Sequence, residues 1–203
     1  MTLIIHHVKQ TRSLRPLWLM EELGLAYELV DHGASIAHID MEAYTAINPM
    51  KKLPAFFDGD KAIYESLAIC EYIAQSYGDG KFMRTPQDDD YADYLQLFHF
   101  GEAGMGGYIG ILLAHTILLP EKQRNPHMAA WAKGEMAQCL AYLESKLSDD
   151  GYLLGSFSLV DISNAYILFL LKISKNAQDF GPRTNAYFSR IRERDAWKRA
   201  TEK

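Results

Sequence analysis

The chain has 203 residues, enough for one large domain or two small ones with a substantial core. Its composition, 48% hydrophobic and 23% charged, is ordinary for a globular protein, and a net charge of -5 disfavours nucleic acid as a partner. The first residues lack the apolar segment of a signal peptide, and no apolar run is long enough to cross a bilayer. We therefore expect a cytoplasmic protein with no membrane or nucleic-acid partner.

The first part of the chain alternates between strand and helix patterns. A β-branched run opens it, a helical pattern ends at Gly24, and a second strand follows, which predicts a right-handed strand–helix–strand crossover. The turn Asp58-Gly59-Asp60 then joins two antiparallel strands. Together these patterns predict a mixed four-stranded sheet covered by helices. The expected strands are 2–8, 26–32, 53–58 and 61–65, and the expected helices are 14–24, 35–48 and 66–78.

The rest of the chain is helical in pattern. Residues 79–86 form a polar, turn-rich segment that is typical of a linker, so we expect an α/β domain at 1–78 and an all-α domain at 87–203. The all-α domain should contain four or more helices. One of them has no polar face across residues 165–171 and should be the central buried helix.

The sequence gives no metal-ligand pattern. His6 and His7 are adjacent on a strand and point to opposite faces, which is poor for shared metal ligation. The run Asp88-Asp89-Asp90 lacks the later ligands of a calcium loop, so we expect a solvated helix start there. Cys70 and Cys139 lie far apart within helical patterns. We expect both to be buried, reduced thiols and no metal site to be present.

Pro54 marks the start of the predicted hairpin. Proline cannot donate to a strand ladder, so it belongs at the first residue of a strand or at an edge. A cis bond before Pro54 would turn the backbone groups of Leu53 outward, where an extended ligand could pair with them. Taken alone, the residue favours an ordinary trans proline.

The pair Glu65-Ser66 stands where the hairpin meets the next helix. Ser66 is a good N-cap, and the N–H groups that begin a helix form a carboxylate site, while Glu65 can pair with an ammonium group. Together they suit the α-amino acid end of a ligand. Taken alone, the two residues favour an ordinary cap at Ser66 and a solvated carboxylate at Glu65.

The loop after the first strand carries hydroxyl and guanidinium groups beside a helix N-terminus. Thr11, Ser13, Arg12 and Arg15 could together stabilise a thiolate, because hydroxyl donors and the helix dipole favour the anion. Lowering a thiol pKa by two units takes roughly 2.7 kcal/mol, which is within reach of one charge-assisted hydrogen bond and a dipole. A capped, solvated loop is the commoner arrangement.

Two further segments have structural interpretations. In residues 155–162, Ser158 and Asp161 are spaced as a capping box, with Phe157 and Ile162 placed as a hydrophobic staple. The glycine-rich segment 101–110 does not fit a dinucleotide-binding motif and follows a helical run. Close helix packing, or room for a ligand, explains it better.

The order of these elements and three of its segments resemble a cytosolic glutathione S-transferase over essentially the whole chain. The segments are "TRSLRPLWLMEELGLAYE", "NPMKKLPAFFDGDKAIYESLAICEYIA" and "GSFSLVDI". The resemblance implies a thioredoxin-like first domain followed by an all-helical domain, with glutathione as co-substrate and no metal. It also implies a homodimeric enzyme of detoxification.

The resemblance implies a role for each candidate site residue. Pro54 would be the family's cis-proline, and the backbone of Leu53 would pair with the cysteinyl part of glutathione. Glu65 and Ser66 would hold its γ-glutamyl end, and Lys52 would approach its glycyl side. Lys51 departs from the family, because relatives often have glycine at this position; its charge could contact the anionic tripeptide.

The catalytic hydroxyl has three possible assignments. By the resemblance Thr11 occupies the position of the hydroxyl in serine-type members and is our first choice, and Ser13 is the second. The third is that no side-chain donor dominates. Arg12 would supplement the field on the thiolate.

The implied reaction is direct attack of the glutathione thiolate on a small hydrophobic electrophile, by proximity and thiolate stabilisation. Phe100, Met105 and Tyr108 are candidate walls of the electrophile pocket, although each fits core packing equally well. Two alternatives stay open. One is a non-catalytic binding or regulatory module of the same fold, and the other is a glutathione-dependent isomerase or peroxidase.

Overall fold

The computed structural model describes residues 2–33 and 35–203. Its contacts divide the chain into two compact units, one that runs to Met83 and includes Arg192–Lys203, and one that comprises Arg84–Ile191. The predicted fold class, a thioredoxin-like domain followed by a helical domain, is confirmed. The domain boundaries 1–78, 79–86 and 87–203 stay a prediction.

The first unit is built on a four-stranded mixed sheet, as predicted. Strands β1 (Leu3–His7) and β2 (Glu28–Asp31) pair in parallel, β1 pairs antiparallel with β3 (Ala55–Asp58), and β3 pairs antiparallel with β4 (Lys61–Ile63). The order across the sheet is β2-β1-β3-β4, so β1 and β3 are central. This order brings the end of β1 and the start of β3, two predicted site segments, to the same edge of one sheet.

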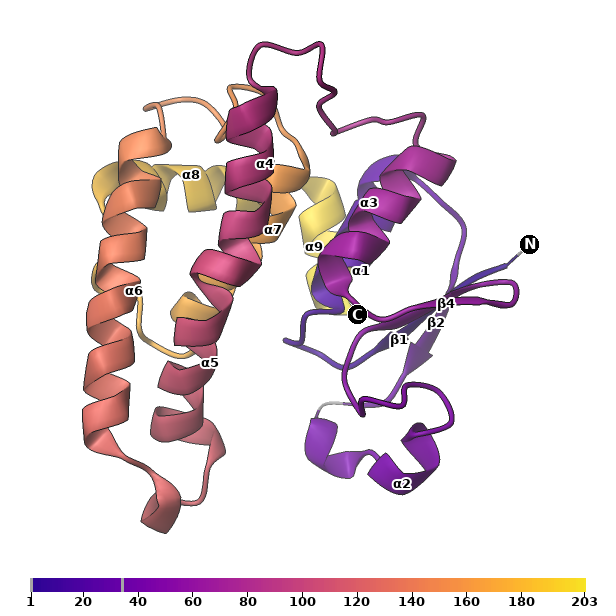
Figure 1. Ribbon diagram of the computed structural model, residues 1–203, viewed down its shortest axis with the longest axis horizontal. Helices are drawn as coiled ribbons and strands as arrows, with labels where there is room; N and C mark the ends of the chain where they lie inside the picture. The colour runs from indigo at the N-terminus through magenta and orange to yellow at the C-terminus, as the bar shows by residue number, and fades with distance from the viewer. Residues whose placement is uncertain (1, 34) are drawn as a thin grey trace. The chain divides into compact units, whose positions relative to one another are not determined.

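Four α-helices and one short 3-10 turn belong to this unit. Helices α1 and α3 lie side by side, as Figure 1 shows, whereas α2 lies away from them. Gly24 ends α1 in the left-handed conformation, with φ of 66°, which confirms the predicted helix stop. The bounds are α1 Leu14–Leu23, η1 Ile36–His38, α2 Met41–Tyr44, α3 Ser66–Tyr77 and α9 Asp195–Glu202.

Helix α9, at the far end of the sequence, packs on α1. The Trp18 and Trp197 rings meet edge to face with centroids 4.7 Å apart, and both side chains are buried. Beside them the Arg194 guanidinium pairs with Glu22 at 2.6 Å. These contacts involve Trp18 and Glu22, which lie beyond the first turn of α1.

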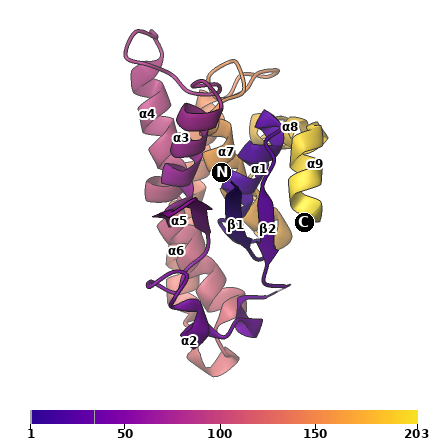
Figure 2. The same cartoon turned by 90° about the vertical axis from the view of Figure 1, so that its right-hand side faces the viewer.

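The second unit is all-helical. Its bounds are α4 Tyr91–His99, η2 Phe100–Gly104, α5 Gly106–Leu113, η3 Ala114–Leu118, η4 Glu121–Gln123, α6 Pro126–Lys146, α7 Leu159–Ile173 and α8 Pro182–Glu193, whose last two residues belong to the first unit. Helix α4 runs through the π-helical η2 into α5, as Figure 2 shows. Helix α7 is buried along nearly its whole length, which confirms the predicted central helix.

Glycine allows a close helix crossing in this unit. A Cβ at Gly101 would lie 2.3 Å from Ser163 Oγ, so no larger residue fits against α7 there. The Ser163 hydroxyl donates to the Phe98 carbonyl at 2.7 Å across the same crossing. Close packing therefore explains this part of the glycine-rich segment.

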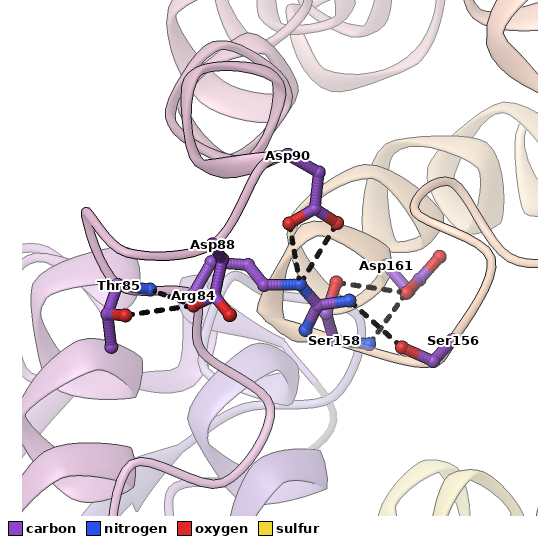
Figure 3. Close-up of polar contacts among 7 residues, drawn as sticks. All are labelled: Arg84, Thr85, Asp88, Asp90, Ser156, Ser158 and Asp161. Carbon is purple, nitrogen blue, oxygen red and sulfur yellow. Dashed lines mark hydrogen bonds and ion pairs between the residues drawn. The ribbon is translucent and has the colours of Figure 1, made fainter.

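Polar contacts hold the starts of α4 and α7 (Figure 3). Arg84 Nε donates to Asp90 at 3.0 Å and its Nη2 donates to Ser156 at 2.9 Å, and Asp88 accepts from the Thr85 N–H and hydroxyl. The acidic run begins α4, as predicted, with Asp90 at the N-cap position and the two aspartates before it exposed. The Asp88 and Asp90 carboxylates also have specific partners that a local sequence pattern does not reveal.

The predicted capping box at Ser158 and Asp161 is confirmed. The Asp161 carboxylate is fully buried and accepts from the Ser158 N–H at 2.8 Å, the Leu153 N–H at 3.1 Å and the Tyr187 hydroxyl at 3.0 Å. One carboxylate therefore ties the start of α7 to the preceding loop and to α8.

Among the described residues, no helix combines the length and the apolar character that a bilayer crossing requires.

Replacing Asp161 should destabilise the fold strongly. Asp161→Ala leaves buried donors on Ser158, Leu153 and Tyr187 without their acceptor, so we expect the free energy of unfolding to fall by about 3 kcal/mol. Denaturant unfolding followed by circular dichroism measures the change. The matched control is Asp149→Ala, which removes an exposed ion pair to Arg183 and should change the same quantity by less than about 0.5 kcal/mol. Equal effects of the two substitutions would contradict this account.

Candidate active site

A tight turn connects β1 to α1 and shapes the first half of the site. The Val8 carbonyl accepts the Thr11 N–H at 3.3 Å and the Thr11 hydroxyl at 2.8 Å. Gln10 adopts the left-handed conformation, with φ of 65°, which lets the chain reverse between them. Ser13 then occupies the N-cap position of α1.

Two hydroxyl groups meet in this turn, and they differ in exposure. Thr11 Oγ1 and Ser13 Oγ are 2.7 Å apart, and Ser13 Oγ lies 2.8 Å from Nδ1 of His7. Ser13 is fully buried, whereas Thr11 is partly exposed. Of the two predicted catalytic hydroxyls, Thr11 is the one with surface that a ligand can reach.

His7 is the buried end of β1 and a site residue that the sequence reasoning missed. Burial lowers its pKa to about 4; Asp31, its register partner on β2, opposes the shift, and Lys9 reinforces it. The imidazole is therefore neutral at physiological pH. The alternation along β1 and the short loop that follows are the sequence signals that could have directed attention to it.

Arg15 links the N-termini of two helices. It lies in the first turn of α1, is fully buried, and donates from Nη1 to the Ser66 hydroxyl at 3.2 Å. Arg12 is partly exposed in the loop before α1. Together with two helix N-termini, a buried guanidinium makes this region favourable for anions.

The start of α3 differs by one residue from the prediction. The helix begins at Ser66, and Glu65 rather than Ser66 occupies the N-cap position, without a side-chain cap hydrogen bond. Ser66 is buried and accepts from Arg15, so its hydroxyl is engaged by a tertiary contact that outweighs the local cap preference. The Glu65 side chain is exposed. The N–H groups of the first turn still form a potential carboxylate site.

The loop before β3 holds the predicted proline. The Leu53–Pro54 peptide bond is cis, which confirms what the resemblance implies. Buried Asn48, missed by the sequence reasoning, organises the loop: its amide donates to the Lys52 carbonyl at 2.7 Å and its Oδ1 accepts from the Met50 N–H at 2.9 Å. The Lys52 side chain is exposed, so its charge is available to a ligand.

Lys51 shows why glycine suits this position. Its φ is 55°, in the left-handed region that glycine adopts without steric cost. The Lys51 ammonium lies 3.3 Å from Glu42, and both groups are largely exposed. The side chain therefore already has a partner on α2.

The predicted pocket residues lie in the second unit. Met105 is fully buried, whereas Phe100 and Tyr108 are partly exposed. The Phe100 ring packs edge to face on Tyr142, with centroids 5.1 Å apart, and the Tyr108 ring packs on Trp131 at 5.6 Å. Only Phe100 and Tyr108 of the three therefore present surface in this structure.

The cysteines do not resemble catalytic thiols. Both are free, and burial raises the pKa of Cys70 to about 12, so it stays protonated and unreactive. Cys139 is partly exposed, which corrects the expectation that both cysteines are buried; burial also raises its pKa. Within 2–33 and 35–203, no three His, Cys, Asp or Glu side chains are grouped so that they could hold a metal ion.

Comparisons with known proteins point in one direction. The family profile described as "Glutathione S-transferase, N-terminal domain" matches residues 2–75. "Glutathione S-transferase PARB" of Nicotiana tabacum is 30% identical over 200 residues, which cover 95% of this chain and 93% of that protein.

Two solved structures extend the similarity to the whole chain. The glutathione transferase URE2P8 of Phanerochaete chrysosporium, solved with oxidized glutathione, has a TM-score of 0.83 and 26% identity, covering 99% of this chain and 94% of that one. Ure2p5 of the same fungus, cocrystallized with 1-(S-glutathionyl)-2,4-dinitrobenzene, has a TM-score of 0.81 and 25% identity, covering 99% and 93%.

Burial of His7 predicts a loss of stability in mild acid. Its folded pKa of about 4 lies below the ordinary 6.5, so the unfolded chain binds the proton first and the free energy of unfolding falls as the pH drops through this window. Between about pH 7 and about pH 5, the wild type should lose about 2 kcal/mol more than His7→Asn, which has no such group to protonate. Urea unfolding at the two pH values measures the difference. Equal losses would contradict the assignment.

Proposed function

Because the chain belongs to the glutathione S-transferase family, we propose that it conjugates the thiolate of glutathione to a small hydrophobic electrophile. The observation that carries this proposal is the partly exposed Thr11 hydroxyl at the N-terminus of α1. It lies in the same compact unit as the cis-proline loop and the Arg15–Ser66 contact. This unit would therefore offer glutathione a hydrogen-bond donor for its thiolate, a site for its carboxylate and a strand edge for its backbone.

Glutathione carries charges at both ends, and the site residues complement them. The γ-glutamyl carboxylate would sit at the N-terminus of α3, where Ser66 and buried Arg15 add a hydroxyl and a positive charge. The exposed Glu65 carboxylate would pair with the adjoining ammonium. The backbone of Leu53 would pair with the cysteinyl unit, and Lys52 would approach the glycyl carboxylate.

The chemistry depends on stabilising the thiolate. Thr11 would donate its hydroxyl proton as a hydrogen bond to the sulfur, while the α1 N-terminus and Arg12 favour the negative charge. The thiolate then attacks the electrophilic carbon, the S–C bond forms, and the leaving group departs with its electron pair. No covalent enzyme intermediate is needed, so the protein contributes thiolate stabilisation and proximity.

The electrophile class follows from the helical unit and from one relative. Phe100 and Tyr108 would offer aromatic surface to an apolar substrate, with Met105 as buried support. The dinitrophenyl conjugate in Ure2p5 makes 1-chloro-2,4-dinitrobenzene a suitable first substrate to assay. We also propose that the enzyme acts as a homodimer in the cytoplasm.

Thr11→Ala should impair conjugation. Loss of one hydrogen bond to an ionised sulfur is expected to lower kcat/KM for 1-chloro-2,4-dinitrobenzene by roughly 10- to 100-fold, whereas Thr11→Ser should retain most activity. The matched control is Thr201→Ala, which removes a hydroxyl bonded to a helix carbonyl on α9 and should leave the rate unchanged. Steady-state absorbance assays measure each variant.

The possible results separate the candidate functions. An unchanged rate in Thr11→Ala would overturn the assignment of the hydroxyl. Glutathione binding without conjugation of any aryl halide would favour the binding module. Turnover of a peroxide or an isomerisable substrate in place of the aryl halide would favour the isomerase or peroxidase reading.

Ser66→Ala and Glu65→Gln should weaken glutathione binding more than they slow the chemical step. The first removes a hydroxyl at the carboxylate site and the second the charge opposite the ammonium, so we expect each dissociation constant to rise by roughly tenfold. Isothermal titration calorimetry with glutathione measures the constants. Glu71→Gln, an exposed change on α3, is the matched control and should bind as the wild type does. Wild-type affinity in both site variants would contradict the proposed orientation of glutathione.

A further inference from the structure

A series of short polar contacts, called the donor series below, connects the buried end of β1 to the hydroxyl of the partly exposed Thr11. His7 Nδ1 lies 2.8 Å from Ser13 Oγ, Ser13 Oγ lies 2.7 Å from Thr11 Oγ1, and Thr11 Oγ1 lies 2.8 Å from the Val8 carbonyl oxygen. Each separation is that of a full hydrogen bond. The donor series therefore contains three hydrogen bonds.

Three hydrogen bonds require three protons, and their sources can be counted. The Ser13 and Thr11 hydroxyls supply one proton each, and the Val8 carbonyl supplies none. The third proton must come from Nδ1 of His7. Ser13 Oγ also lies 3.4 Å from the Val8 carbonyl oxygen, which is longer than the usual O–H···O range and cannot replace a contact of 2.7 to 2.8 Å. When all three short contacts are hydrogen bonds, Nδ1–H donates to Ser13, Ser13 donates to Thr11, and Thr11 donates to the Val8 carbonyl.

We propose that His7 is a positioning residue which, through Ser13, holds the Thr11 hydroxyl as a donor toward the glutathione sulfur. The proposal rests on the proposed function. In this arrangement the Thr11 oxygen accepts the hydrogen bond from Ser13, so the Thr11 proton does not donate to Ser13. It can turn from the Val8 carbonyl to an arriving thiolate, and the carbonyl keeps the Thr11 N–H at 3.3 Å. No proton is transferred along the donor series.

The opposite tautomer of His7 would weaken this donor. With the proton on Nε2, Ser13 would donate to Nδ1, and the Thr11 proton would be drawn into the contact with Ser13. Donation to sulfur would then break that bond. With the proton on Nδ1, the Ser13 bond instead polarises Thr11 and strengthens its donation.

The surroundings of His7 keep the imidazole neutral while glutathione titrates. His7 is buried, and the charged groups that face it are Asp31 from β2 and Lys9 from the loop after β1. Burial lowers the pKa of His7 to about 4, whereas a thiol whose pKa falls two units from its ordinary value of about 8.5 ionises near pH 6.5. A shift in the pKa of the bound thiol therefore reports on the donor series and not on ionisation of His7.

The test measures the pKa of the bound glutathione thiol from thiolate absorbance in the binary complex. We expect Ser13→Ala and His7→Phe each to raise this pKa by about one unit and to lower kcat at mildly acidic pH by about tenfold. KM for glutathione should change less than about twofold, because the groups that bind the tripeptide are intact. His7→Asn should stay near the wild type, since its side-chain N–H can still donate to Ser13.

His6→Asn is the matched control. His6 is the neighbouring histidine on the opposite face of β1, where Nδ1 lies 2.9 Å from Nε2 of His32. This variant should leave the pKa of the thiol unchanged even where it alters stability.

The outcomes are distinguishable. If Thr11→Ala shifts the thiol pKa but Ser13→Ala and His7→Phe do not, the positioning role is overturned and the proposed function stands. If the wild type gives no bound thiolate, both fail. Where the buried substitutions prevent folding, the nitrogen NMR shifts of wild-type His7 decide: a proton on Nδ1 supports the proposal, and a proton on Nε2 overturns it.

Discussion

A fully buried guanidinium sets the geometry of the first unit. Arg15 enters the interior in the first turn of α1 and donates to Ser66 in the first turn of α3. A buried charge is costly unless polar acceptors pair with it, and the hydrogen bond from Arg15 to the Ser66 hydroxyl, at 3.2 Å, joins the first turns of the two helices. Their dipoles and the guanidinium carry the same sign. The result is a region that an anionic ligand stabilises.

The sheet supplies the second constraint. Because β1 runs antiparallel to β3, the loop after β1 and the loop before β3 leave the sheet at one edge. The first carries Thr11 and the second carries the cis-proline. Buried Asn48 fixes the second loop from within, much as the Val8 turn fixes the first. Side chains that are far apart in sequence thereby lie at the same end of the sheet.

Local patterns were enough to predict much of this fold. The alternation of strands, the Gly24 stop and the capping box at Asp161 depend on residues within a few positions of each other, so the sequence expresses them directly. The packing of α9 on α1 could not be predicted, because it depends on Trp18 and Trp197 meeting across the chain. The same reason explains the cap at α3: Ser66 has a good cap side chain, but Arg15 engages it.

The candidate site shows the same division. The hydroxyls, the proline and Glu65 were found from residue type and family spacing, whereas their burial was not. Ser13 and Thr11 carry the same functional group two residues apart, and only the turn at Val8 decides which one is buried. The position of His7 on a strand predicts which face it occupies, but its contact with Ser13 depends on the loop that follows the strand.

The two hydroxyls also bear on the proposed role of Thr11 as the hydrogen-bond donor to the thiolate. Serine populates all three staggered χ1 rotamers, whereas the β-branch of threonine restricts which of them are accessible. In this loop the restriction suits the chain, because Thr11 Oγ1 must lie within hydrogen-bond distance of Ser13 and Val8 at once. What remains adjustable is the direction of a single proton, which is the freedom that donation to a thiolate requires.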